Sequence, residues 1–411
     1  MLYWLYEILK DSDIPGIGML QYLSFRSAVA IVLSLIIATI FGKSLIRLLQ
    51  RKQIGEEIRN LGLEGQLEKK GTPTMGGIII ILAIVIPTVL CADLSNIYVV
   101  LMLVTTMWLG FVGFLDDYIK TFKKNKKGLA GKFKIVAQVL LGLGITLALY
   151  NGDRLGIRET NVAQSALVDE GSGRVESAQN KLSEVCYHTT RTTVPFSKNI
   201  RFHYGMLVGA DATSDLAWIV YGLIIVFVIA AVSNAVNLTD GLDGLAAGTT
   251  AISGSTLGIL AYLSGNVIFA SYLNIMYLPD IGELTVFVSA FIGALIGFLW
   301  YNSYPAQVFM GDTGSLTLGG ILAVLAILIR KELLIPVLCF VFLAENLSVI
   351  IQVFWFKLSK RLYGEGRRVF KMSPIHHHFQ KCNYVEPKIV SRFWIVAIAF
   401  AAITIVILKI R

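Results

Sequence analysis

Ten apolar runs restrict what this sequence can fold into. Each has at least the roughly 18 residues that a helix needs to cross the hydrocarbon core of a bilayer. They lie at residues 23–42, 75–92, 97–115, 133–150, 216–233, 244–263, 284–301, 313–330, 333–356 and 391–409. Charged residues make up only 15% of the 411-residue chain, whereas a soluble domain has about 25%. We therefore expect an all-α, polytopic membrane bundle of about ten transmembrane helices, forming a single integral membrane domain over residues 1–411.

The Lys and Arg residues indicate how the bundle is oriented. They are frequent in the loops 43–74, 116–134 and 357–390, whereas the connections 93–96 and 264–283 contain none. With ten spans, all three basic loops fall on one side. Short cytoplasmic loops carry an excess of Lys and Arg, so this side is predicted to be cytoplasmic and both termini periplasmic. Because the basic residues flank apolar spans, we expect the lipid bilayer and not nucleic acid as a partner.

Residues 151–215 do not fit the bundle. The segment is polar and mixed in charge, and it contains Gly171, Ser172 and Gly173 in a row. The span count places it on the extracytoplasmic side, opposite the basic loops. Its low apolar content predicts a small hairpin-rich or partly disordered appendage with little core of its own. A bilayer core of about 30 Å would separate it from a cytoplasmic site.

Two acidic clusters lie at predicted cytoplasmic ends of spans. Asp116 and Asp117 follow the third span and precede a lysine-rich loop. This combination suits Mg²⁺ and phosphate, although a solvated helix end is the simpler alternative. Asn237, Asp240 and Asp243 join the fifth and sixth spans, and the two Asp residues, spaced i and i+3, share a helical face. Helix capping explains one of these carboxylates but not both.

Two further clusters complete the predicted site. Asp312 opens the eighth span between two glycines, where backbone N–H groups bind anions and a carboxylate can hold Mg²⁺ against a diphosphate; a helix cap in a tight turn is the alternative. His376, His377 and His378 are consecutive in the last basic loop. Metal-binding histidines are normally spaced apart, so these fit better as donors to a phosphate or a substrate carbonyl, or as a solvated surface tract.

The four clusters agree in their chemistry. Oxygen ligands without cysteine favour a hard cation, Mg²⁺ or Mn²⁺, and neighbouring lysines favour a phosphorylated substrate. A site at the bilayer surface suits a lipid-borne partner, so the sequence predicts phosphoryl transfer. A secondary transporter of an anion would place its charges near the midplane, whereas these clusters lie at one face.

One ionisable residue lies apart from these clusters. Glu345 is near the middle of the ninth span, where a charged group is costly and suggests function. Because we expect it to lie far from the four clusters, we interpret it as packing against a polar partner.

Five ordered motifs support a resemblance to a known family. They are residues 70–77 (KGTPTMGG), 116–118 (DDY), 237–244 (NLTDGLDG), 309–315 (FMGDTGS) and 374–378 (PIHHH). Together they resemble the bacterial phospho-N-acetylmuramoyl-pentapeptide-transferases, over nearly the whole chain except 151–215. The resemblance implies transfer of phospho-N-acetylmuramoyl-pentapeptide from its UDP-linked donor to undecaprenyl phosphate. This reaction releases UMP, requires Mg²⁺, and forms the first lipid intermediate of peptidoglycan synthesis at the cytoplasmic face of the bacterial inner membrane.

The resemblance also implies roles for individual residues. Asp312 would bind Mg²⁺, and Asp117 would activate the lipid phosphate, with Asp116 beside it. The uridine and diphosphate region would be lined by Asn237, Asp240 and Asp243. Contacts to the donor or its phosphates would come from Lys70, Lys120, Lys132, Asn302, His376 and His377, with His378 in the same group. The family is often dimeric, so a homodimer is also implied.

Two features depart from the family pattern. The insertion at 151–215 is much longer than expected, and residues 360–368 also appear as a lengthened segment, which makes the spacing from Asp312 to His376 less transferable. The alternative within the same superfamily is a polyprenyl-phosphate N-acetylhexosamine-1-phosphate transferase with another UDP-sugar donor. The TPTMGG and PIHHH motifs favour the muramoyl branch.

Overall fold

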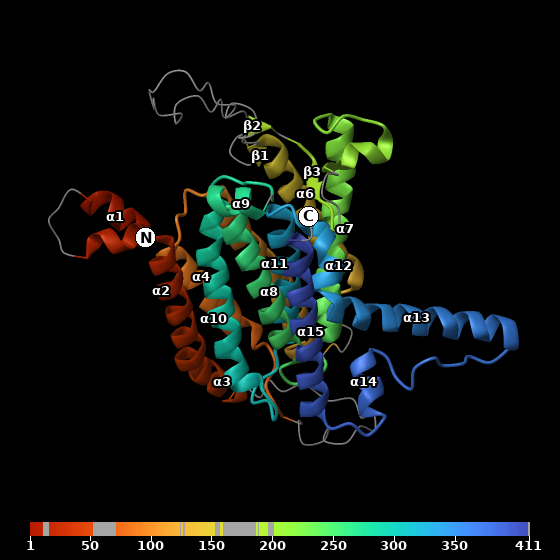
Figure 1. Ribbon diagram of the computed structural model, residues 1–411. Helices are drawn as coiled ribbons and strands as arrows, with labels where there is room; N and C mark the ends of the chain where they lie inside the picture. Colours follow the sequence, from red (N-terminus) through yellow and green to blue (C-terminus); the bar gives the residue numbers. More distant parts are fainter. Residues whose placement is uncertain are drawn as a thin grey trace, which may run out of the picture.

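The computed structural model describes residues 1–10, 16–51, 71–123, 125, 128–152, 157–158, 186–187, 189–195, 201–273 and 275–409. Helices form one bundle (Figure 1). The long helices are α2 (Leu23–Ile36) with α3 (Gly42–Arg51), α4 (Gly77–Cys91), α5 (Ile97–Thr121), α6 (Gly131–Asn151), α7 (Asp215–Thr239), α8 (Leu245–Ser264), α10 (Leu284–Asn302), α11 (Gly311–Leu328), α13 (Phe340–Tyr363) and α15 (Glu386–Lys409). The short ones are α1 (Leu2–Leu9), α9 (Val267–Leu273), α12 (Ile335–Leu338) and α14 (Ile375–Gln380).

Each of the ten predicted spans coincides with one of these long helices, which confirms the all-α membrane bundle. In the described part of the chain, eight helices are long and apolar enough to cross a membrane, and α8 with α9 makes a ninth candidate that is bent by 103°. Helix α4 is shorter, at 15 residues. Both chain ends lie toward the end of the bundle that carries the strands, and α14 lies toward the other end (Figure 1). The sidedness of the termini stays a prediction.

Helix α11 is the centre of the bundle. Every residue from Thr313 to Leu328 is buried, because α4, α5, α7 and α8 all pack against it. Its small residues allow this close approach: an added Cβ at Gly319 would lie 2.5 Å from the Cα atom of Ser233 on α7. The bundle therefore fixes the position of α11, and with it the acidic residue in its first turn.

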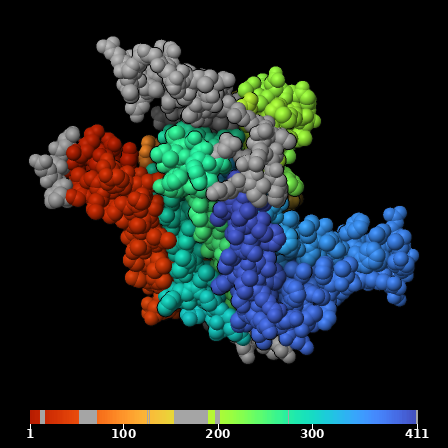
Figure 2. Space-filling view, viewed as in Figure 1, coloured from red at the N-terminus to blue at the C-terminus, as the bar shows by residue number. Residues whose placement is uncertain are grey.

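Helix α13 is oriented differently from the other long helices. It packs against α7 and α15 and then runs sideways out of the bundle as a projecting arm (Figures 1 and 2). Apolar side chains along the arm are exposed, including Ile350, Phe354 and Leu362. A contiguous apolar surface of this kind marks a contact with membrane or with another protein, and here it suits a helix embedded in lipid.

The described part of the insertion contains two short antiparallel pairs. Strand β1 (Ile157–Arg158) pairs with β2 (Cys186–Tyr187), and β3 (Arg191–Thr193) pairs with β4 (Arg201–His203), which the 3-10 helix η3 (Tyr204–Val208) follows. The hairpin content agrees with the sequence-based expectation. Residues 153–156, 159–185, 188 and 196–200 lie outside the described part.

The second pair does not stand apart from the bundle, contrary to the expectation of an appendage with little core. The Lys331 ammonium donates to the hydroxyl of Thr193 at 2.7 Å, and the Tyr204 hydroxyl donates to the carboxylate of Glu332 at 2.9 Å. All four side chains are buried. Burial raises the pKa of the Tyr204 phenol above its usual range, and burial also raises the pKa of Glu332. The insertion thus packs on the connection that follows α11.

Candidate active site

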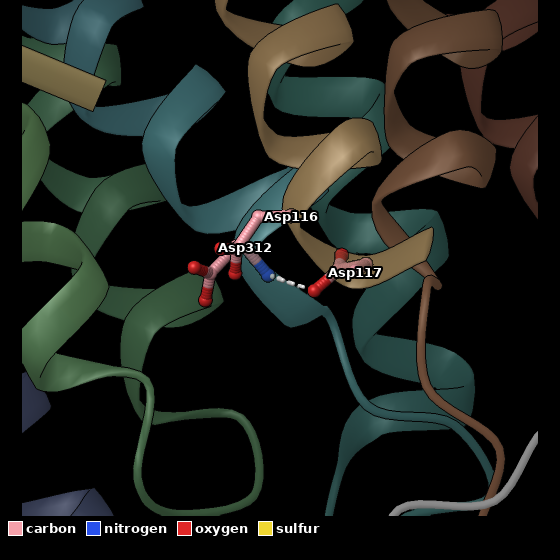
Figure 3. Close-up of side chains that lie close together, drawn as sticks. All are labelled: Asp116, Asp117 and Asp312. Carbon is pink, nitrogen blue, oxygen red and sulfur yellow. Dashed lines mark hydrogen bonds between the residues drawn. The ribbon is translucent and has the colours of Figure 1, made fainter. Parts of the chain in front are cut away.

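Three carboxylates meet where α5 ends and α11 begins. Asp116 and Asp117 lie in the last turns of α5, and Asp312 lies in the first turn of α11 (Figure 3). One oxygen from each residue lies within 4.8 Å of the others. Asp116 and Asp117 are buried, and Asp312 is half-buried. Segments almost 200 residues apart in the chain therefore build one acidic cluster, as the sequence predicted for Asp312 and the Asp116–Asp117 pair.

Asp117 caps the beginning of α11. Its Oδ1 atom accepts a hydrogen bond from the backbone N–H of Asp312 at 3.0 Å. Its Oδ2 atom accepts from the backbone N–H of Thr313 at 2.8 Å and from the hydroxyl of Thr313 at 2.6 Å. The first N–H groups of a helix have no partner within the helix, so a carboxylate from another helix satisfies them here. The simpler alternative of a cap is thus partly right, but Asp117 provides it and not Asp312.

The segment before α4 fixes the other side of this helix end. The backbone N–H groups of Gly76 and Gly77 donate to the carbonyls of Phe309 and Met310, at 2.8 and 2.9 Å. A Cβ at Gly77 would lie 2.1 Å from the backbone nitrogen of Gly314, so only glycine fits there. Lys70, a predicted phosphate contact, lies outside the described residues.

Two lysines point into the acidic cluster. The Lys120 ammonium lies 2.5 Å from Asp116 and 3.1 Å from Asp312. The Lys134 ammonium lies 2.5 Å from Asp312 and 3.2 Å from Asp116. With three carboxylates and two ammonium groups, the cluster has a formal charge of −1. Opposite charges at these distances stabilise each other strongly when they are largely shielded from water.

Of the two lysines predicted in this loop, the structure brings Lys120 to the acidic cluster. Lys134, which was not predicted, occupies the second position, and Lys132 lies outside the cluster. The Lys132 side chain is exposed, and its ammonium lies over the ring of Phe133 at 5.3 Å. A signal in the sequence distinguishes the two lysines. Lys134 is followed at i+3, i+4 and i+7 by Ala137, Gln138 and Leu141, which form the buried face of α6, whereas Lys132 lies on another face.

Asn237 joins the cluster from the last turns of α7. Its amide group donates to Oδ1 of Asp312 at 3.0 Å and to the hydroxyl of Ser315 at 2.8 Å. Asp240 is half-buried and lies in the loop that follows α7. The motif around residue 237 is therefore next to the acidic cluster, as the sequence predicted, and Ser315 is a neighbour that sequence reasoning did not single out.

Asp243 and Asn302 are buried in the scaffold around this loop. A carboxylate oxygen of Asp243 accepts from the backbone N–H of Ala306 at 3.0 Å. Asn302 accepts from the backbone N–H of Gly244 at 3.0 Å and donates to the carbonyl of Val308 at 2.9 Å. These bonds connect the loop after α7 to the loop before α11. Asp243 and Asn302, both predicted to contact substrate, therefore stabilise the two loops that border the site.

The histidine motif forms α14, and its members differ in burial. His376 is fully buried, at 0% exposure, which contradicts the interpretation of a solvated tract. His377 and His378 are half-buried. The Nδ1 atom of His377 lies 2.7 Å from Gln380, and the backbone N–H of Lys371 donates to Nδ1 of His378 at 3.1 Å.

From its position in the span, we expected Glu345 to lie far from the four clusters. This expectation is wrong, because Glu345 contacts the histidine motif. Its Oε2 atom is 3.0 Å from Nδ1 of His376, and both side chains are fully buried. The interpretation of a polar packing partner is correct, but the partner belongs to the histidine motif. No local sequence pattern connects α13 with α14, because the segment between them turns back along the arm (Figure 1).

The donor set fits a magnesium ion. Asp116, Asp117 and Asp312 offer only oxygen ligands within a small space, and Mg²⁺ is usually held by one or two carboxylates together with water and substrate phosphates. The lysines close to Asp312 would place further positive charge beside a phosphate. Helix α11 also directs its N-terminus at this point, where anions are favoured. The arrangement can hold a metal-bound diphosphate.

Comparison with known proteins agrees with this chemistry. Residues 99–330 match the sequence profile of glycosyl transferase family 4, and residues 69–81 match the phospho-N-acetylmuramoyl-pentapeptide-transferase signature 1. Relatives named phospho-N-acetylmuramoyl-pentapeptide-transferase are 57% identical in Parabacteroides distasonis, 56% in Flavobacterium psychrophilum and 54% in Porphyromonas gingivalis. Each similarity covers 100% of this chain and 100% of the relative.

Proposed function

Since the chain belongs to the phospho-N-acetylmuramoyl-pentapeptide-transferase family, we propose that it transfers phospho-N-acetylmuramoyl-pentapeptide from its UDP-linked donor to undecaprenyl phosphate. The net reaction forms a bond between an oxygen of the lipid phosphate and the sugar-bearing phosphorus of the donor. It breaks the bond between that phosphorus and the bridging oxygen, and UMP leaves. The observation that carries the proposal is the meeting of Asp116, Asp117 and Asp312 with Lys120 and Lys134 in a membrane bundle.

The donor diphosphate is proposed to lie against Lys120, Lys134 and the start of α11. Both ammonium groups already contact Asp312, so they can turn to phosphate oxygens without leaving the site. Charge neutralisation and positioning supply most of the catalysis in phosphoryl transfer. Asp240 lies in the adjoining loop and is proposed to face the uridine. Lys70, His377 and His378 are proposed to contact other parts of the donor.

Asp312 is proposed to hold Mg²⁺, which would neutralise charge on the diphosphate. Its carboxylate is half-buried, and the amide of Asn237 orients it at 3.0 Å. Such an orienting bond matters because outer groups fix the direction of a metal ligand. Asp116 lies between the same two lysines and would hold them in place when Asp312 binds the ion.

Asp117 is proposed to face the acceptor phosphate, as the resemblance implies. A carboxylate has about four acceptor sites, two on each oxygen. Thr313 occupies Oδ2 with two hydrogen bonds, whereas Oδ1 accepts one bond, from the backbone N–H of Asp312. Oδ1 therefore keeps an acceptor position for a proton or for the ion, while the rest of the carboxylate stays fixed.

We also propose that this site opens to the cytoplasm at the bacterial inner membrane. The basic loops predicted as cytoplasmic contain Lys120 and Lys134, and the three aspartates lie at the ends of helices and not at mid-span. A soluble UDP-linked donor and a membrane lipid can meet only at such a boundary.

A UMP-release assay tests the function. Purified protein would receive undecaprenyl phosphate, Mg²⁺ and either UDP-N-acetylmuramoyl-pentapeptide or UDP-N-acetylglucosamine. We expect UMP only with the muramoyl donor, together with a lipid-linked product that carries the pentapeptide. Release with the N-acetylglucosamine donor alone would assign the chain to the other branch of the superfamily.

A further inference from the structure

A buried connection runs from α13 to the loop after α7. Oε2 of Glu345 is 3.0 Å from Nδ1 of His376, and the other side of the His376 ring faces Gly241. If Gly241 had a Cβ, it would lie 2.3 Å from Nε2 of His376, and the three nearest atoms would all belong to that ring. Three elements that are distant in sequence therefore meet at one imidazole.

The burial of this pair limits what it can do. Glu345 and His376 are each 0% exposed, so neither presents an atom to a donor molecule in this structure. A buried carboxylate is costly unless another group compensates for it. The imidazole of His376 lies beside Oε2 of Glu345. Removal of either side chain would therefore leave the other buried without this polar neighbour.

The loop that the imidazole supports belongs to the proposed donor site. Gly241 follows Asp240 directly and precedes Asp243 by two residues, and Asn237 at the end of α7 donates to Asp312. Asp243 is bonded to the loop before α11. A shift of the backbone at Gly241 would thus be transmitted to residues on both sides that face or frame the donor.

We propose that Glu345 and His376 are positioning residues, which hold the 240–243 loop in the conformation that binds the uridine diphosphate part of the donor. Glu345 fixes the imidazole, and the imidazole fills the space beside the Gly241 backbone. The inference rests on the proposed function, because that function gives the loop its ligand. His376 then acts through the loop and does not itself touch the donor.

The first test is a double-mutant cycle with Glu345→Ala, His376→Ala and the double variant. The readouts are kcat/KM for the UDP-linked donor and the inhibition constant of UMP. Loss of a buried partner typically changes an equilibrium about tenfold or more. We expect each single variant to weaken UMP binding and kcat/KM by at least about tenfold, and the double variant to lose no more than the worse single. The Mg²⁺ concentration for half-maximal activity should not move. Glu365→Ala, which removes an exposed acid beyond α13, is the control.

A second test keeps the proposal falsifiable if those variants fold poorly. Gly241→Ala should displace the imidazole and weaken UMP binding, whereas the same change in the His376→Ala background should cost far less, because the space is then free. Glu345→Gln, which retains a hydrogen-bonding group, should recover part of the loss of Glu345→Ala.

Two results would overturn the inference while leaving the proposed function intact. One is multiplicative loss in the double variant, which would mean that His376 acts on the donor independently of Glu345. The other is an equal cost of Gly241→Ala in both backgrounds. If the wild type instead uses a different UDP-sugar, the proposed function fails, but the cycle can still be measured with UMP.

Discussion

The carboxylate of Asp117 accepts a hydrogen bond from the backbone N–H of Asp312 at 3.0 Å (Figure 3). A side chain from the last turns of α5 thereby accepts a hydrogen bond from a backbone N–H group in the first turn of α11. This bond fixes the backbone of Asp312, the proposed metal ligand. Removal of Asp117 would affect the position of Asp312 as well as any direct chemistry, so stability and activity should be measured together.

Asp117→Ala should lower both activity and stability, because buried N–H groups at the start of α11 lose their acceptor. We expect a loss of about 1–3 kcal/mol in unfolding free energy and at least ~10²-fold in turnover. Asp117→Asn retains one acceptor oxygen and should lose a similar amount of turnover with a smaller shift in Tm. Thermal unfolding in detergent and UMP release check the pair. An unchanged Tm in Asp117→Ala would contradict the capping role.

Lys134 and Lys132 form a matched test of the site's electrostatics. Lys134→Gln should reduce kcat/KM by about 10- to 100-fold, since it removes a charge beside Asp312 where a phosphate is expected. Lys132→Gln should remain within about twofold, as expected for an exposed surface change. Steady-state kinetics at varied concentrations of the UDP-linked donor measures kcat/KM for both variants. An equal loss of kcat/KM in both variants would mean that only the net positive charge of the loop matters, and not the position of Lys134.

How far the sequence predicts this site depends on the kind of contact involved. The helices and the Asp motifs follow from hydropathy and spacing, so the sequence alone identifies Asp116, Asp117 and Asp312 as candidate site residues. Burial of Asn302, and the contact of Glu345 with His376, depend on how distant elements pack. Such pairings leave no periodic signal in one sequence. Lys134 is an intermediate case, because the face of α6 identifies it once the helix is recognised.

Glu332 should make stability depend on pH in a defined direction. Burial raises its folded-state pKa, so its contribution to stability is fully present below the ordinary Glu pKa of about 4.3 and is lost as pH rises through the raised value. Glu332→Gln cannot ionise, and its Tm advantage over wild type should grow from pH 5 to pH 8. Paired unfolding curves in detergent provide the measurement. A constant difference across this range would mean that Glu332 does not change its protonation state there.

The insertion at 151–215 should be divisible into a dispensable and a required part. Arg158 pairs with Cys186, so residues 159–185 can be replaced by a short Gly/Ser turn with little entropic cost, and activity and Tm should both persist. A wider replacement of 156–210 would remove Thr193 and Tyr204, which contact buried Lys331 and Glu332. That variant should unfold at a lower temperature. If both variants matched the wild type in Tm, the contacts at Lys331 and Glu332 would contribute nothing.

The most direct test of the account compares wild type with Asp312→Asn in a UMP-release assay over a range of Mg²⁺ concentrations. Asn preserves the shape of the side chain but removes the charge proposed to hold the ion. With UDP-N-acetylmuramoyl-pentapeptide and undecaprenyl phosphate, wild type should release UMP only when Mg²⁺ is present. Asp312→Asn should be slower by at least ~10²-fold at saturating Mg²⁺, and Asp211→Asn, an exposed carboxylate, should match wild type. Turnover by Asp312→Asn at the wild-type rate would contradict the assignment of the active site.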